Sequence, residues 1–165
     1  PAPDAMVLDC GCGGGANIKT LLKLCPKGKV QGIDYSAVSV EKARKVNAGA
    51  IAAGRCTVQQ ASVAELPFEA EQFEVVTAFE TVYFWPELVQ NFREVYRVLK
   101  PGGVFFICNE ANGETAKDDK WTQIINGMTI YTDTALKTYL EQAGFCKIQS
   151  HKNKKGWLCV TAQKR

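Results

Sequence analysis

The chain has 165 residues, of which 46% are hydrophobic and 22% charged, as is ordinary for a globular protein. A net charge of +3 is too small to indicate a nucleic-acid partner, and no apolar run is long enough to cross a membrane. The seven cysteines follow neither a disulfide framework nor zinc-site spacing. We therefore expect a cytoplasmic protein with no membrane span, no metal site and no nucleic-acid partner.

Strands and helices are predicted to alternate along the first two thirds of the chain. Apolar runs predict strands at residues 6–10, 29–34, 56–60, 73–79 and 104–108. Helical spacing of apolar residues predicts helices at 16–25, at 37–53 behind a capping Ser36, and at 86–99, where the sequence Lys-Pro-Gly-Gly at 100–103 ends the last one. Helices between successive strands force right-handed crossovers, so the sequence predicts a parallel sheet covered on both faces.

The last third of the chain follows a different pattern. Residues 109–129 are the least regular part, Thr132 is placed to cap a final helix through Ala143, and strands are predicted at 145–151 and 157–163. The short connection between these two strands makes them an antiparallel hairpin. We expect the segment between the fifth strand and the final helix to supply part of a substrate wall through its apolar side chains, namely Trp121, Ile124, Ile125, Met128 and Tyr131.

Asp9 and the glycines that follow the first strand mark the predicted ligand site. Four glycines fall within the five positions 11–15, and a helix follows, which is how an α/β protein builds a nucleotide-like site. Asp34 ends the second strand, where a carboxylate can accept hydrogen bonds from both hydroxyls of a ribose. Gly11-x-Gly13-x-x-Ala16 with Asp34 also satisfies the dinucleotide fingerprint, so an NAD(P)-dependent oxidoreductase remains an alternative here.

Residues after the later strands extend the same site. Tyr35 can lie along an adenine face, and Ser62 and Val63 are placed to touch an adenine edge and face. Glu80, Thr81 and Tyr83 follow the fourth strand and would face the reactive end of the ligand, while Phe84 and Trp85 are expected to pack against the following helix. Glu80 and Tyr83 are the catalytic candidates. The one histidine, His151, falls in the hairpin, away from this end of the sheet.

Four stretches together carry a resemblance to a known family. Asp9-x-Gly11-x-Gly13-x-Gly15, Asp34, Ala-Ser-Val-Ala-Glu-Leu-Pro-Phe at 61–68 and Arg-Val-Leu-Lys-Pro-Gly-Gly at 97–103 resemble class I S-adenosylmethionine-dependent methyltransferases. The similarity is closest to the small-molecule branch that includes ubiquinone/menaquinone biosynthesis. It implies a Rossmann-like three-layer sandwich whose seven-stranded, mostly parallel sheet has the order 3-2-1-4-5-7-6 with strand 7 antiparallel.

The resemblance also implies S-adenosylmethionine as cofactor and assigns its binding residues by position. These are Asp9, Gly11 and Gly13 for the methionine part, Asp34 and Tyr35 for the ribose, Ser62 and Val63 for the adenine, and Glu80 and Thr81 under the sulfonium, with Cys12 as a further cofactor-binding residue. The family commonly has an aspartate where this chain has Ser62. Serine is shorter and uncharged, so we expect a weaker contact with the adenine.

The hypothesis favoured by the sequence is methyl transfer from S-adenosylmethionine to a small-molecule acceptor. The alternatives are the oxidoreductase and a non-catalytic S-adenosylmethionine-binding module. Asp9 two positions before the first glycine, the Leu-Pro-Phe stretch and the terminal hairpin argue against the oxidoreductase. We expect residues 1–165 to form one domain that lacks the N-terminal lid segment usual in the family, as part of a longer protein or with an open site.

Overall fold

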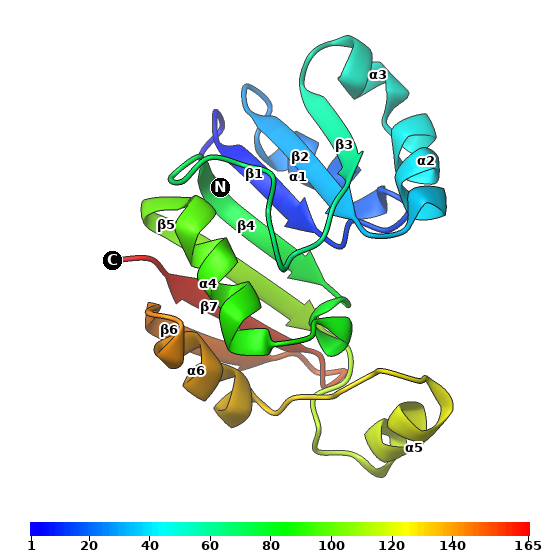
Figure 1. The fold of residues 1–165 in the computed structure, drawn as a ribbon, viewed down its shortest axis with the longest axis vertical. Coiled ribbons are helices and arrows are strands. Elements are labelled where there is room, and N and C mark those ends of the chain that lie inside the picture. The colour runs from blue at the N-terminus through cyan, green and yellow to red at the C-terminus, as the bar shows by residue number, and fades with distance from the viewer.

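The computed structural model describes residues 1–165, apart from the side chains of residues 116 and 117. One sheet of seven strands runs through the molecule in the order β3-β2-β1-β4-β5-β7-β6 (Figure 1). Its strands are β1 (Met6–Cys10), β2 (Lys29–Asp34), β3 (Cys56–Gln60), β4 (Phe73–Phe79), β5 (Leu99–Asn109), β6 (Cys146–Lys152) and β7 (Leu158–Gln163). The pairs from β3 to β5 are parallel, and β7 is antiparallel to both of its neighbours. The predicted sheet order and the antiparallel hairpin are confirmed.

Helices cover both faces of the sheet, as a three-layer sandwich requires. They are α1 (Ala16–Leu24), α2 (Ala37–Val46), α3 (Ala48–Ala52), α4 (Leu88–Val98), α5 (Ala116–Ile124) and α6 (Asp133–Gln142), with a 3-10 turn, η1, at Val82–Phe84. Figure 1 shows α4 and α6 on one face, α1 behind the sheet, and α5 beyond the end of β5. Buried side chains form two clusters, one packed around Phe92 and Leu136 and the other around Ile18 and Val40. Each cluster anchors one layer of helices by removing apolar surface from water.

The predicted single helix at 37–53 is wrong, because Asn47 divides it into α2 and α3. The Asn47 side chain is buried and its Nδ2 donates to the carbonyl oxygens of Ala43 and Gly15, both at 3.0 Å. A side-chain amide that bonds the backbone competes with helix continuation. The break therefore ties α2 to the last glycine of the loop after β1.

The boundary between the fourth helix and the fifth strand also differs from the prediction. Helix α4 begins at Leu88, two residues after Pro86, and β5 starts at Leu99 with no turn between them. The Lys-Pro-Gly-Gly sequence lies inside β5, where the register against β4 shifts between Phe73 and Val75. Gly102 has φ +78° and Gly103 packs against backbone atoms of β4, so these residues form a bulge rather than a helix stop.

The final helix and the two strands predicted for the C-terminal part are present as α6, β6 and β7. Thr132 caps α6 by accepting a hydrogen bond from the Ala135 N–H at 3.2 Å, as its position predicts. The segment predicted to be irregular, 109–129, contains α5, whose apolar side chains Trp121 and Ile124 are largely exposed. None of the helices described here is both long and apolar enough to cross a bilayer.

Candidate active site

The loop after β1 needs its glycines. Gly11, Gly13 and Gly15 have φ values of +74°, +50° and +81°, in the left-handed region that side chains disfavour. The N–H groups of Gly11 and Cys12 both donate to the Ile33 carbonyl at 2.9 Å. A Cβ built on Gly11 would lie 2.2 Å from Thr81 Oγ1. The loop is therefore fixed closely between the carboxyl ends of β2 and β4.

Asp34, at the end of β2, shapes this loop. Its Oδ2 accepts a hydrogen bond from the Gly13 N–H and its Oδ1 one from the Ser36 N–H, both at 2.9 Å. A carboxylate can accept about four hydrogen bonds. Asp34 therefore keeps acceptor capacity on each oxygen for hydroxyl groups of a ligand.

Asp9 lies behind the loop and is 1% exposed. Its Oδ1 accepts a hydrogen bond from Thr77 Oγ1 at 2.7 Å, while its buried Oδ2 has no partner among the described atoms. Burial in the protein interior raises the pKa of Asp9 to about 7. An unpartnered buried acceptor costs free energy, so this position favours a donor from a ligand or water.

Two adjoining cavities open around Gly11 and Asp34. The Ser62 cavity, of about 460 Å³, is lined by Gly11, Ile33, Asp34, Tyr35, Ala61, Ser62, Val63, Thr81, Phe84, Trp85, Pro86 and Gly127. The glycine-loop cavity, of about 500 Å³, is lined by Gly11, Cys12, Gly13, Gly14, Ala16, Asn17, Asp34, Tyr35, Ser36, Ser39, Phe79, Glu80, Thr81 and Phe84. Every cofactor residue predicted from the sequence lines one or both cavities except Asp9, which lies buried behind them.

Sequence reasoning missed several residues of these cavities. Phe84 lines both cavities and is 45% exposed, so the expectation that it packs against the following helix is wrong. Trp85 does pack against the following helix, edge-on to Phe92 of α4 with ring centroids 6.0 Å apart, although it also lines the Ser62 cavity. Phe84 ends η1, a few residues after β4, and the aromatic run Tyr-Phe-Trp at 83–85 was the available signal. Gly127 lies far along the chain from the other lining residues, and no sequence signal placed it in the cavity.

A third cavity, the α5 cavity, lies beside the glycine-loop cavity and shares Glu80 with it. It has a volume of about 220 Å³ and is lined by Glu80, Tyr83, Glu110, Ala111, Trp121, Ile125 and Met128. Three of the five apolar residues predicted for a substrate wall are therefore placed here. Ile124 is 63% exposed instead, and Tyr131 packs edge-on against Tyr139.

Glu80 and Tyr83 join the ends of β4 and β5. The Glu80 carboxylate accepts hydrogen bonds from the Glu110 N–H and from the Tyr83 hydroxyl, the latter at 3.3 Å, and Tyr83 in turn accepts one from the Ala111 N–H at 2.9 Å. Glu80 has φ +55°, a strained conformation for a residue with a side chain. Desolvation raises the pKa of the Glu80 carboxyl and of the Tyr83 hydroxyl above their ordinary values. His151 lies elsewhere, in a cavity on the β6–β7 surface.

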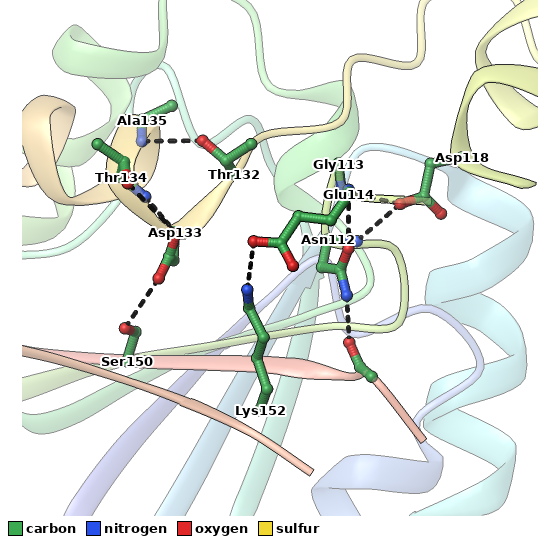
Figure 2. Close-up of polar contacts among 11 residues, drawn as sticks. Asn112, Gly113, Glu114, Asp118, Thr132, Asp133, Thr134, Ala135, Ser150 and Lys152 are labelled. Atoms are coloured by element: carbon green, nitrogen blue, oxygen red, sulfur yellow. Dashed lines mark hydrogen bonds and ion pairs between the residues drawn. The ribbon is translucent and has the colours of Figure 1, made fainter. Parts of the chain in front are cut away.

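The segment that carries α5 is held by polar contacts (Figure 2). Asp118 of α5 accepts hydrogen bonds from the N–H groups of Asn112 and Gly113, at 3.3 and 2.8 Å. Lys152 on β6 forms an ion pair with Glu114. Together these contacts fasten the loop after β5 to the C-terminal hairpin. The α5 cavity is therefore closed by a segment whose anchors are mostly polar.

Known proteins similar to this chain agree with this geometry. The family described as "Methyltransferase domain" matches residues 8–107. A demethylmenaquinone methyltransferase of Symbiobacterium thermophilum is 34% identical over 67% of this chain and 44% of its own length. Cycloartenol-C-24-methyltransferase 1 of rice (Oryza sativa subsp. japonica) is 31% identical over 64% of this chain and 30% of its own length. The chain thus spans less than half of these curated relatives.

Solved structures give the same fold. A SAM-dependent methyltransferase from Aquifex aeolicus superposes with a TM-score of 0.83 over 98% of this chain and 82% of its own, at 22% identity. The chain belongs to the methyltransferase domain family, whose matched residues include the glycine loop and Asp34. Its curated relatives include methyltransferases of quinone and sterol biosynthesis, and S-adenosylmethionine is the cofactor that membership of this family implies. The nicotinamide alternative is set aside by these matches. Among the described side chains no three His, Cys, Asp or Glu residues are grouped to hold a metal ion.

Proposed function

We propose that this protein transfers the methyl group of S-adenosylmethionine to a small-molecule acceptor. The observation that carries the proposal is the pair of joined cavities around Gly11 and Asp34, which gathers nine of the ten residues assigned to the cofactor from sequence. S-Adenosylmethionine supplies an electrophilic methyl group on a sulfonium. The protein's task is then to hold donor and acceptor close and aligned.

The residues present fit that cofactor. Free acceptor capacity on Asp34 suits the two hydroxyls of a ribose, and Gly13 faces open space where a Cβ would stand. The unpartnered Asp9 Oδ2 supports a donor group, such as the ammonium of the methionine part, on that side of the loop. Ser62 and Val63 line the cavity on the side assigned to the adenine.

Glu80 and Thr81 supply the end of the site next to the acceptor. Glu80 lines both the glycine-loop cavity and the α5 cavity, so its carboxylate can face donor and acceptor together. Tyr83 is a positioning residue, since its hydroxyl donates to that carboxylate. Desolvation by burial raises the pKa of the Glu80 carboxyl above its ordinary value.

The remaining alternative is a module that binds S-adenosylmethionine without turnover. A titration of the purified protein with S-adenosylhomocysteine and, separately, with NADH tests the cofactor assignment. We expect saturable binding of S-adenosylhomocysteine and none of NADH; the reverse pattern would overturn the proposal. Incubation with methyl-labelled S-adenosylmethionine and a panel of acceptors separates the enzyme from the module, because only the enzyme transfers label.

We also propose that the protein works in the cytoplasm as one cofactor-binding unit on a small molecule rather than on nucleic acid. All seven cysteines are unpaired thiols, which supports a reducing compartment. The net charge of +3 gives little support for binding a polyanion. Modification of all seven thiols by a maleimide in unfolded protein from freshly lysed cells would be the expected result, and prior disulfides would contradict it.

A further inference from the structure

The α5 cavity combines a small volume with an uneven charge. Its volume of about 220 Å³ lies below the range of roughly 300–1,000 Å³ typical of sites for drug-sized ligands. It can therefore enclose a single ring with a short substituent, or the corresponding end of a larger molecule. Its lining residues include the apolar Trp121, Ile125 and Met128 and the acidic Glu80 and Glu110.

The charge around this cavity is negative. Two of its lining residues carry carboxylates, and none of its described lining side chains is basic. Desolvation is the main cause that raises the pKa of the Tyr83 hydroxyl, and a third carboxylate, that of Asp118, adds to it. A cavity lined by charge of one sign concentrates ligands of the opposite sign and repels like-charged ones.

The polar groups of the lining residues suit a cationic group in particular. Glu80 Oε1 already accepts hydrogen bonds from the Glu110 N–H and Tyr83, whereas Oε2 has only a 3.4 Å contact with Tyr83. A carboxylate oxygen with spare lone pairs is a strong acceptor for an ammonium. Trp121 is 50% exposed and adds an aromatic ring to the same cavity, and such rings attract cations.

We infer that the α5 cavity recognises a small cationic amine, with its apolar body against Trp121 and Met128 and its ammonium group at Glu80 and Glu110. The inference rests on the proposed function, since Glu80 also lines the cavity assigned to S-adenosylmethionine. The amine is the group by which the methyl acceptor is recognised. A neutral or anionic compound of the same shape binds more weakly because it brings no positive charge to the two carboxylates.

Three matched probes test this inference by calorimetry, with and without saturating S-adenosylhomocysteine: 2-phenylethylamine, 2-phenylethanol and phenylacetate. We expect the amine to bind about 10-fold more tightly than the alcohol, and phenylacetate to bind least. Glu110→Gln should weaken amine binding about 5-fold, as expected for one partly exposed charge, and leave alcohol binding unchanged. It should not change the affinity for S-adenosylhomocysteine, because Glu110 lines only the α5 cavity.

Glu114→Gln is the matched control, because this carboxylate lies on the same loop but pairs with Lys152. It should leave the order of the three probes unchanged. Equal affinities for amine and alcohol, or tightest binding of phenylacetate, would overturn the inference. If S-adenosylhomocysteine fails to bind while the amine preference holds, the proposed function fails and the cavity assignment stands. If S-adenosylhomocysteine binds and the preference is missing, only the cavity assignment fails.

Discussion

The two ends of the proposed site are built in different ways. The cofactor end is supported by strand ends, by backbone hydrogen bonds to Asp34 and Ile33, and by a cluster of fully buried side chains that includes Val7 and Ile18. The α5 end is closed by a helix with exposed Trp121 and Ile124, held by polar contacts near the surface. Local stability follows buried apolar contact. The donor cavity is therefore preformed, and the acceptor cavity is the more adaptable part.

The largest expected effect comes from the tightest point of the cofactor end. Gly11→Ala places a Cβ against Thr81 and forces a residue with a side chain to adopt φ +74°. Strain and displacement of about 3 kcal/mol correspond to roughly 100-fold weaker binding of S-adenosylhomocysteine, measured by calorimetry. Gly49→Ala, in open space on α3, is the control and should bind normally. Normal binding by Gly11→Ala would show that the loop is not preformed.

Removing the Asp34 charge should have the next largest effect. In Asp34→Asn one oxygen becomes an amide nitrogen, which cannot accept the hydrogen bond now made by Gly13 or Ser36. Loss of a charge-assisted hydrogen bond costs about 1.5–3 kcal/mol, so S-adenosylhomocysteine should bind at least about 10-fold more weakly. Glu41→Gln, which removes an exposed carboxylate paired with Lys45, should not change the affinity. If both variants bind S-adenosylhomocysteine with similar affinity, Asp34 does not belong to the cofactor site.

The burial of Asp9 predicts an unusual pH dependence of stability. Its pKa rises from 3.8 to about 7 on folding, so between these values the folded state holds a proton that the unfolded state has lost. The stabilisation is complete below pH 3.8 and is lost as the pH rises to about 7. Asp9→Asn cannot ionise and so does not show this loss. The free energy of unfolding of the variant, measured with denaturant, should therefore rise relative to that of the wild type by a few kcal/mol between pH 4 and pH 7. A constant difference across that range would contradict the account.

The smallest effect on the cofactor is expected from the α5 end. Asp118→Ala removes the acceptor for the Asn112 and Gly113 N–H groups. These amides should exchange hydrogen faster, because a local opening that breaks about 1–3 kcal/mol of interactions becomes more frequent. The affinity for S-adenosylhomocysteine should change less than about two-fold. A large loss of cofactor affinity would show that the two ends are coupled.

The sequence could predict the cofactor end of the proposed site better than the α5 end. The strand, the glycines and Asp34 are set by local spacing, so their shared site could be predicted. The break at Asn47 could not, because it depends on a hydrogen bond to Gly15, far away in sequence. Nor could the positions of Phe84 and Gly127, since packing around η1 and the path of the chain after α5 decide them. Three of the four sequence stretches, at 9–15, 34 and 61–68, contribute residues to the cofactor end, whereas the stretch at 97–103 forms the end of α4 and the beginning of β5, away from both cofactor cavities.

One measurement tests the central claim that the glycine loop and Asp34 hold S-adenosylmethionine. Amide chemical shifts of the isotope-labelled protein are followed as S-adenosylhomocysteine is added. The account predicts the largest chemical-shift changes at Ser62 and at the N–H groups of Gly13 and Ser36, which donate hydrogen bonds to Asp34. The changes at Asn112 and Trp121 should be small. Changes confined to the α5 end, with Gly13 and Ser36 unaffected, would contradict it.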